Sequence, residues 1–420
     1  MAYRLILSLL AALIVSPAHA DITGTPRVDD GDTLKISGER AVAKAMKFWY
    51  GNIHAHTSED SGENNIPEST HEEAFLYAMD DTKGNLDFLA ITPHNHLVKK
   101  RSYKNLQITT NDPKYYIPGK FVPIAGQEYS SISKGNHINV FELDAWINKY
   151  AVPNGEFKKL FDEFIPAHKT KMTFAQFNHP NSPTFSGNEG REYGRDDYVG
   201  PDGSLERWIA ATDPYVQVIE IVGAPYYQEA TNRPHYDEKP SRVNAWLWAL
   251  SKGWHLAPAA NQDNHRRNWG SASDGRTVAI STALTRDSIT DAFKERRVYA
   301  SEDSTLQVTF KAGSSWMGSI VRKEDFGGFQ VMAHDPEEPD AEYMFELFEG
   351  LIGGAALKHT SQPIDKQILQ DGKTSYFYRP DARGGNYYFI RVTQSKTPSD
   401  HNGTEDNAWT APIWIVSDAP

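Results

Sequence analysis

The 420-residue sequence contains no cysteine, and this absence excludes several kinds of site. Without thiols the chain has no disulfide scaffold and no sulfur nucleophile, so any bound metal must have nitrogen and oxygen ligands. The formal net charge of −12 argues against a protein that mainly holds nucleic acid on a basic surface. The sequence also lacks a Gly-x-Ser-x-Gly elbow and a Gly-rich lysine loop of the nucleotide-binding type.

Apolar runs long enough to span a membrane are missing as well, and the first twenty residues have the features of a secretory signal peptide. Arg4 supplies a positive charge, an apolar stretch covers residues 5–15, and Ala18-His19-Ala20 is a small-x-small cleavage signal. We therefore expect a mature protein without a membrane anchor, in a periplasm or outside the cell. Residues 21–40 form a polar N-terminal extension.

Strand-like and helix-like segments alternate over residues 41–303. A helix is expected over 70–80, because Thr70-His71-Glu72-Glu73 is a capping box and apolar residues follow at helical spacing. Two further helices are expected over 156–164 and 241–251, the latter with Pro240 near its start. The strand-like runs cover 47–54, 86–92, 121–125, 137–143, 172–177, 216–222 and 255–260. This alternation predicts an α/β fold with a parallel sheet or a barrel surrounded by helices.

Residues 304–420 have a different pattern, in which short strands follow one another without a helix. The runs cover 306–310, 329–333, 343–348, 376–378, 387–392 and 411–416, and turns rich in Gly, Pro, Asp and Asn separate them. Such a pattern is typical of a β-sandwich, so we predict a second domain that begins at residue 304.

Six of the fifteen histidines lie at, or just beyond, a predicted strand, and three carboxylates accompany them. The nine residues are His54, His56, Asp60, His94, Glu128, His137, His179, Asp263 and His265. In α/β barrels the carboxyl ends of the strands meet at one mouth, so residues far apart in sequence come together there. Imidazole and carboxylate ligands suit Zn, Mn or Fe better than Mg or Ca. The pattern predicts two to three divalent transition-metal ions. Glu220, in another strand-like run, has either a supporting role beside this site or a purely structural one.

Five motifs carry these residues in chain order. They are Tyr50-Gly51-Asn52-Ile53-His54-Ala55-His56-Thr57 with Asp60 in the following loop, Asp87-Phe88-Leu89-Ala90-Ile91-Thr92-Pro93-His94, Gly126-Gln127-Glu128 together with Asn136-His137-Ile138-Asn139-Val140, Asn178-His179-Pro180 and Asp263-Asn264-His265. The set resembles the polymerase and histidinol phosphatase (PHP) family of metal-dependent phosphoesterases. The C-terminal segments 388–392 and 408–414 resemble secreted members grouped with carbaryl hydrolase.

The resemblance implies a distorted (β/α)7 barrel, followed by the β-sandwich, with a three-metal centre. It implies one metal held by His54, His56, Glu128 and Asp263, a second held by Glu128, His137 and His179, and a third held by Asp60, His94 and His265. Glu59 is the alternative to Asp60, because the spacing of that loop is unusual. The sequence departs from the family at Asn52 and Pro93, where aspartate is usual, and this changes the support of the histidines rather than the number of ligands.

The implied activity is hydrolysis of phosphate mono- or diesters by a hydroxide held between two metals. Glu128, Asp263 and His265 are the implied catalytic residues. Lys134, Arg266 and Arg267 are candidates for binding an anionic, small-molecule ester substrate. Two alternatives stay open: the same site cleaves an aryl carbamate or a carboxylic ester, or the chain is a non-catalytic binding protein with a degenerate barrel. The sequence leaves the oligomeric state open.

Overall fold

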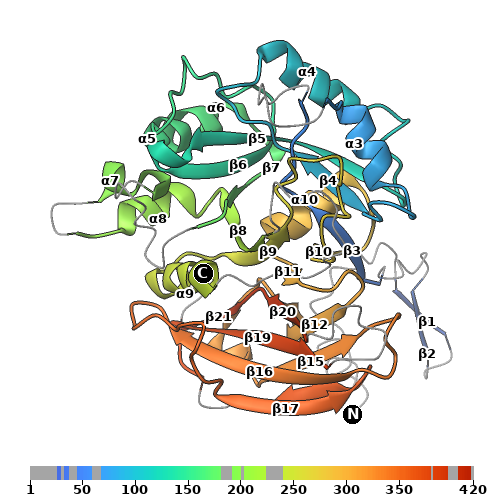
Figure 1. Ribbon diagram of the computed structural model, residues 1–420. Helices are drawn as coiled ribbons and strands as arrows, with labels where there is room; N and C mark the ends of the chain where they lie inside the picture. Colours follow the sequence, from blue (N-terminus) through green and yellow to red (C-terminus); the bar gives the residue numbers. More distant parts are fainter. Residues whose placement is uncertain are drawn as a thin grey trace. The chain divides into compact units, whose positions relative to one another are not determined.

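The computed structural model describes residues 26–29, 33–36, 45–58, 68–180, 192–199, 203–223, 240–379, 382–395 and 405–417 (Figure 1). The chain divides into two units, 1–46 and 47–420, and each is considered by itself. In the first unit, β1 (Pro26–Asp29) pairs antiparallel with β2 (Thr33–Ile36). The predicted signal peptide lies outside the described residues. Across the part of the chain that the structure describes, no helix combines the length and apolarity needed to cross a bilayer.

The second unit begins with strands that belong to one continuous sheet. They are β3 (Lys47–Asn52), β4 (Phe88–Ile91), β5 (Val122–Ser131), β6 (Asn136–Leu143), β7 (Lys169–Phe177), β8 (Val216–Gly223), β9 (Ala257–Asn261), β10 (Arg276–Ser281) and β11 (Val298–Ser301). β3, β4 and β5 are parallel, as are β7, β8 and β9, and β6 lies antiparallel between the two groups. An isolated parallel bridge pairs Ala55 with Asn264. The segments that follow β3 and β9 therefore lie side by side, although five strands, β4 to β8, separate β3 from β9 in the sheet order.

These strands are covered on both faces. Every residue of β4, β6 and β8 is buried, which is typical of sheets with helices or other elements packed on either side. The polar side chains within such strands must therefore find partners inside the protein. Such partners include other polar side chains: His137 of β6 contacts Glu128 of β5.

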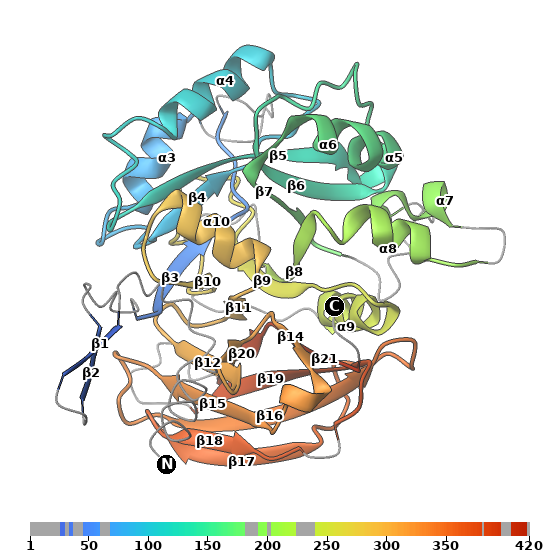
Figure 2. The ribbon, with the colours of Figure 1, turned by 180° about the vertical axis from the view of Figure 1, so that it is seen from behind.

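Helices connect the strands of this part of the fold (Figures 1 and 2). The longer ones are α3 (His71–Ala78), α4 (Lys100–Thr109), α8 (Glu206–Thr212), α9 (Pro240–Lys252) and α10 (Arg286–Lys294). The short ones are η1 (Ile132–Lys134), α5 (Phe157–Lys159), the π-turn η2 (Leu160–Phe164), α6 (Ile165–His168), η3 (Glu192–Gly194) and α7 (Arg195–Tyr198). The predicted capping box is confirmed, since Thr70 accepts from the Glu73 backbone and the Glu73 carboxylate accepts from Thr70 N. The helix predicted over 241–251 is α9, and the one predicted over 156–164 is also helical, with α5 followed directly by the π-helical η2 and then by α6.

Helix α10 packs against one end of the strand series. Phe293 of α10 contacts Phe88, the first residue of β4, with ring centroids 5.8 Å apart, and stacks on Phe174 of β7 at 4.7 Å. Phe174 in turn stacks on Phe141, near the carboxyl end of the antiparallel β6, at 4.3 Å. The aromatic cluster fills this end of the fold with apolar side chains.

Strands dominate the rest of the chain. They are β12 (Gln307–Ala312), β13 (Ser315–Trp316), β14 (Ile320–Arg322), β15 (Phe329–His334), β16 (Glu342–Leu351), β17 (Asp365–Gln370), β18 (Thr374–Phe377), β19 (Asn386–Gln394), β20 (Asp406–Thr410) and β21 (Ile413–Val416), with the short turn η4 (Lys323–Asp325). β12, β13, β15 and β18 form a four-stranded sheet, and the others extend the large sheet through the pairing of β11 with β20. The predicted α/β class with additional C-terminal strands is confirmed at this level.

The two regions of the second unit share a hydrophobic core. Trp246 of α9 packs on Phe389 of β19 with ring centroids 4.9 Å apart, and Phe389 stacks on Phe348 at 5.0 Å. Within the C-terminal strands, Phe329 and Tyr388 join the two sheets at 5.0 Å. The domain boundary between residues 303 and 304 stays a prediction.

Candidate metal centre

Eight of the nine predicted ligands lie together at the end of strands β3–β9 opposite to α10. His54 and His56 follow β3, His94 follows β4, Glu128 lies in β5, His137 in β6, and His179 follows β7, while Asp263 and His265 follow β9. The ninth predicted ligand, Asp60, and its alternative Glu59 lie outside the described residues. Among the described residues, the structure thus brings together side chains that are far apart in the chain, such as His56 and Asp263, which are separated by 207 residues.

His137 reaches this end of the sheet by a different route from the other ligands. It is the second residue of β6, whereas the parallel strands contribute residues at or beyond their carboxyl ends. Because β6 runs antiparallel to β5, its amino end lies beside the carboxyl end of β5, with His137 opposite Ser130. The reversed strand therefore completes the cluster rather than interrupting it.

Glu128 lies at the centre of the cluster and is 1% exposed. Its two carboxylate oxygens approach the rings of five histidines. Oε1 lies 2.8 Å from His137 Nδ1, 3.1 Å from His54 Nε2 and 3.5 Å from His179 Nε2, while Oε2 lies 3.0 Å from His94 Nδ1 and 3.3 Å from His56 Nε2. One side chain thus touches both halves of the histidine cluster.

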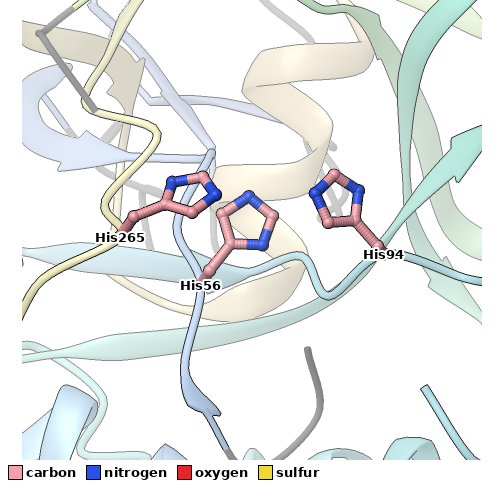
Figure 3. Close-up of side chains that lie close together, drawn as sticks. All are labelled: His56, His94 and His265. Atoms are coloured by element: carbon pink, nitrogen blue, oxygen red, sulfur yellow. The ribbon is translucent and has the colours of Figure 1, made fainter. Parts of the chain in front are cut away.

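Asp263 forms a second carboxylate contact on the β3 side. Its Oδ1 lies 3.1 Å from His54 Nε2 and 3.0 Å from His56 Nε2. Figure 3 shows the rings of His56, His94 and His265 side by side, with His56 in the middle. The His56 ring centroid is 4.9 Å from that of His94 and 4.5 Å from that of His265. The ring nitrogens of these three histidines lie close enough together to hold a metal ion.

The donor atoms of this cluster are spaced for metal ions. Four groups of three side chains have ligand atoms within 4.8 Å of one another: His56 with His94 and His265, His54 with His56 and Asp263, His54 with Glu128 and His179, and His94 with Glu128 and His137. Within the described part of the chain, the buried atoms His54 Nε2 and Glu128 Oε2 make no hydrogen bond despite their close neighbours. Buried polar atoms normally have a partner, so nitrogen and oxygen lone pairs that converge in this way fit bound cations.

Burial and charge act in opposite directions on these groups. Burial alone would raise the pKa of Glu128, but the surrounding imidazoles, led by His137, hold that pKa well below its ordinary value. The pKa of Asp263 is likewise held well below its ordinary range by His54 and its neighbours, against the effect of burial. Burial lowers the pKa of His137 to about 4. Deprotonated carboxylates and a neutral imidazole are the protonation states that metal ligands need.

Burial would also lower the pKa of His54, yet the carboxylates of Asp263 and Glu128 hold it well above its ordinary value.

Two of the cluster residues have unusual backbone conformations: φ is 27° at His179 and 45° at Asp263. Such left-handed conformations cost a non-glycine residue roughly 1–3 kcal/mol and concentrate at functional sites. The fold therefore holds these two side chains in place against a local preference.

The two positions that depart from the PHP pattern have structural roles. Asn52 accepts hydrogen bonds from His54 N at 3.1 Å and Gln262 N at 3.1 Å, and donates to Asn264 Oδ1 at 2.8 Å. An aspartate has no donor for the third bond. The carbonyl of Pro93 accepts from Glu128 N at 2.9 Å. Both residues therefore support the ligand segments through hydrogen bonds.

Glu220 is the residue of this cluster that the sequence leaves unassigned. Its Oε2 lies 2.9 Å from His54 Nδ1, and its Oε1 accepts from Arg242 Nη1 at 2.6 Å. A sequence signal exists in retrospect, because a carboxylate inside the apolar run 216–222 must have a buried partner.

The three predicted substrate-binding residues do not lie in the cluster itself. Lys134 is exposed at the end of η1, and Arg267 is exposed and forms an ion pair with Glu73. Arg266 is partly buried, and its guanidinium donates to the carbonyl of His265 at 3.0 Å. Of the three predicted substrate-binding residues, Arg266 is thus the one that is hydrogen-bonded to a residue of the cluster.

Comparison with known proteins assigns the chain to no characterized family. No family model matches the chain. It is similar to an uncharacterized protein of Chlamydia muridarum and to one of Chlamydia pneumoniae, each 26% identical over an alignment of 159 residues, and the match covers 34% of this chain. The match covers 23% of each of these proteins, so the chain spans less than a quarter of the length of the relatives that it matches.

Proposed function

We propose that the chain is a secreted metal-dependent hydrolase of the PHP type that cleaves phosphate mono- or diesters. The observation that carries the proposal is the convergence of histidines and carboxylates around the buried Glu128. The proposal takes β3–β9 as a distorted (β/α)7 barrel, with the bridge between Ala55 and Asn264 as its closure, and the strands beyond residue 304 as the β-sandwich.

The cofactors of this proposal are two to three Zn, Mn or Fe ions. Glu128 and Asp263 would hold them together with the six surrounding histidines. When bound, such ions lower the pKa of a water and neutralise charge that develops on phosphoryl oxygens. No protein nucleophile is then required, in keeping with the absence of cysteine.

The residues of the chain supply position and charge. Glu128 contacts histidines on both sides of the cluster, so its two oxygens would be ligands on both sides and supply negative charge there. Arg266 is held beside His265 by its hydrogen bond to the backbone, which favours an anionic substrate at this side of the site. These features fit a phosphate ester better than an uncharged ester.

The test is metal analysis of the purified protein, followed by assays of nitrophenyl phosphate mono- and diesters and a naphthyl carbamate. We expect two to three equivalents of metal, activity on the phosphates, and loss of activity after chelation. His54→Gln should abolish activity, whereas His168→Gln should not, because His168 forms an exposed pair with Asp144 outside the cluster. Less than one equivalent of metal would overturn the proposal. Activity on the carbamate alone would reassign the substrate.

A further inference from the structure

Glu220, Arg242 and His54 form a buried chain behind the cluster. His54 Nδ1 lies 2.9 Å from Glu220 Oε2, and Arg242 Nη1 lies 2.6 Å from Glu220 Oε1. The exposed fractions are 0% for His54, 1% for Glu220 and 6% for Arg242. Each nitrogen of the His54 ring thus faces a different group, with Nε2 directed to Glu128 and Asp263.

The backbone around Glu220 accommodates this arrangement. Gly223 ends β8, and a Cβ atom at that position would overlap the Arg242 guanidinium and lie 2.8 Å from Glu220 Oε1. Arg242 lies in the first turn of α9, which packs beside β8. A residue without a side chain therefore makes room for the ion pair at the end of the strand.

The ion pair fixes the charge of the carboxylate. The guanidinium of Arg242 lies 2.6 Å from Glu220 Oε1, and a buried guanidinium at this distance pairs with a deprotonated carboxylate. A carboxylate accepts hydrogen bonds and cannot donate them, so when Nε2 of His54 is a metal ligand, the ring proton lies on Nδ1 and is accepted by Glu220. The lone pair of that ring then lies on Nε2, toward the cluster.

We infer that Glu220 is a positioning residue for His54, held by Arg242, and that it fixes the tautomer and ring orientation with which His54 binds metal. The inference rests on the proposed function, since it requires His54 to be a ligand. Carboxylates that hold the far nitrogen of a ligand histidine commonly raise metal affinity, and their removal typically costs roughly 10- to 100-fold.

The chain offers a matched control for the loss of a buried carboxylate. Glu142, in β6, lies 3.8 Å from Arg286 Nε and accepts from Ala125 N at 3.0 Å. It is 9% exposed and is not part of any of the four ligand groups. Glu142→Gln therefore removes a comparable carboxylate without touching a proposed ligand.

Glu220→Gln keeps the size of the side chain but cannot satisfy both partners. If the amide oxygen accepts from His54, the amide NH2 faces Arg242; if it is turned round, the NH2 faces Nδ1 and selects the other tautomer. Either arrangement weakens the presentation of Nε2.

The experiment is titration of the metal-free full-length protein with Co²⁺, followed by the visible absorption spectrum of the bound ion and by the thermal melt of the apo-protein. We expect Glu220→Gln to bind Co²⁺ roughly 10- to 100-fold more weakly, with an altered spectrum, and Glu142→Gln to match the wild type. Arg242→Met, which leaves Glu220 in place, should give a smaller loss of Co²⁺ affinity. This variant replaces Glu220→Gln as the test if Glu220→Gln does not fold.

The outcomes are distinguishable. If the wild type binds no Co²⁺, the proposed function fails. If the wild type binds Co²⁺ and Glu220→Gln keeps the same affinity and spectrum, the positioning role is wrong and the proposed function stands. Where Glu220→Gln does not fold, the same conclusion follows if Arg242→Met keeps the wild-type affinity and spectrum. Equal losses in Glu220→Gln and Glu142→Gln would assign Glu220 a structural role only.

Discussion

Asn178 Nδ2 donates a hydrogen bond to Glu128 Oε1 at 2.9 Å. The orientation of this amide is fixed from behind, because Gln176 Nε2 donates to Asn178 Oδ1 at 2.9 Å and Asn261 Nδ2 donates to Gln176 Oε1 at 2.9 Å. The three amides and Glu128 are all buried. A chain of amide dipoles therefore ends on the central carboxylate, with a donor directed at its charge.

We predict that Asn178→Asp lowers kcat by about 10- to 100-fold. The variant replaces a donor by a second carboxylate beside Glu128, and a hydrogen bond to a charged group contributes about 1.5–3 kcal/mol. The measurement is kcat for a phosphate ester together with metal content. Asn386→Asp is the matched control, since Asn386 donates to Glu349 in the C-terminal strands. Equal rates in wild type and Asn178→Asp would show that this bond does not support Glu128.

Glu128→Gln should reduce kcat by at least about a thousandfold with native circular dichroism. The substitution removes the central charge and puts an NH2 group where cations need an acceptor. The expected size follows from the roughly 4 kcal/mol that one well-placed transition-state interaction supplies. A variant that keeps more than a tenth of the wild-type kcat with full metal content would contradict the central role of this residue.

Asp303 gives the stability of the protein a pH dependence outside the cluster. Burial, reinforced by the nearby Asp335 carboxylate, raises its pKa to about 7. The folded state therefore holds this proton more tightly than the unfolded state. The contribution of Asp303 to the free energy of unfolding is fully present below about pH 4 and is lost as the pH rises through 7.

We expect Asp303→Asn to raise the melting temperature at pH 8, by an amount equivalent to about 1–3 kcal/mol, and to leave it unchanged near pH 4. The amide oxygen of asparagine still accepts from Thr305 N and Leu306 N, as Asp303 Oδ1 does at 2.6 Å to each. Thermal melts across this pH range are the measurement, with the exposed Asp81→Asn as control. The same shift at both pH values would mean that titration of Asp303 is not the cause.

Phe389→Ala should lower the stability of the whole second unit by about 3–5 kcal/mol. Phe389 is 3% exposed and packs on Trp246 of α9, so the cavity lies between the C-terminal strands and the α/β region. Hydrogen exchange of β8 and β9 measures whether the loss spreads. Faster exchange confined to the C-terminal strands would show that the two regions unfold independently. Ile368→Ala, on an exposed position of β17, is the control.

The sequence predicts the elements that carry strong local signals. The capping box at Thr70 and the helix that starts at Pro240 occur where expected, because caps and proline act within one turn of a helix. The helix predicted over 156–164 is present, but residues 160–164 form the π-helical η2, which apolar spacing does not reveal. Strands β10 and β11 are missing from the predicted set; they pair with each other, and each also pairs with a strand distant in the chain, β10 with β3 and β11 with β20.

The clustering of the predicted ligands follows from their positions at strand ends. What the sequence cannot supply is the direction of β6, which brings His137 to the site from the amino end of its strand. Nor does it assign Glu220, because the contact with His54 joins residues that are 166 positions apart and depends on the order of the strands. Both are properties of tertiary pairing rather than of local pattern.

The bridge between Ala55 and Asn264 also constrains the order of events in folding. His56 N donates to Asn264 O at 3.0 Å, and His56 lies 207 residues before Asp263. Closing so long a segment costs entropy that only the completed set of strands recovers, so this contact belongs to the slow, non-local part of folding. The ligand set is therefore incomplete on a nascent or partly folded chain. If metal ions bind as we propose, they meet the complete ligand set only after the segments that follow β3 and β9 have paired.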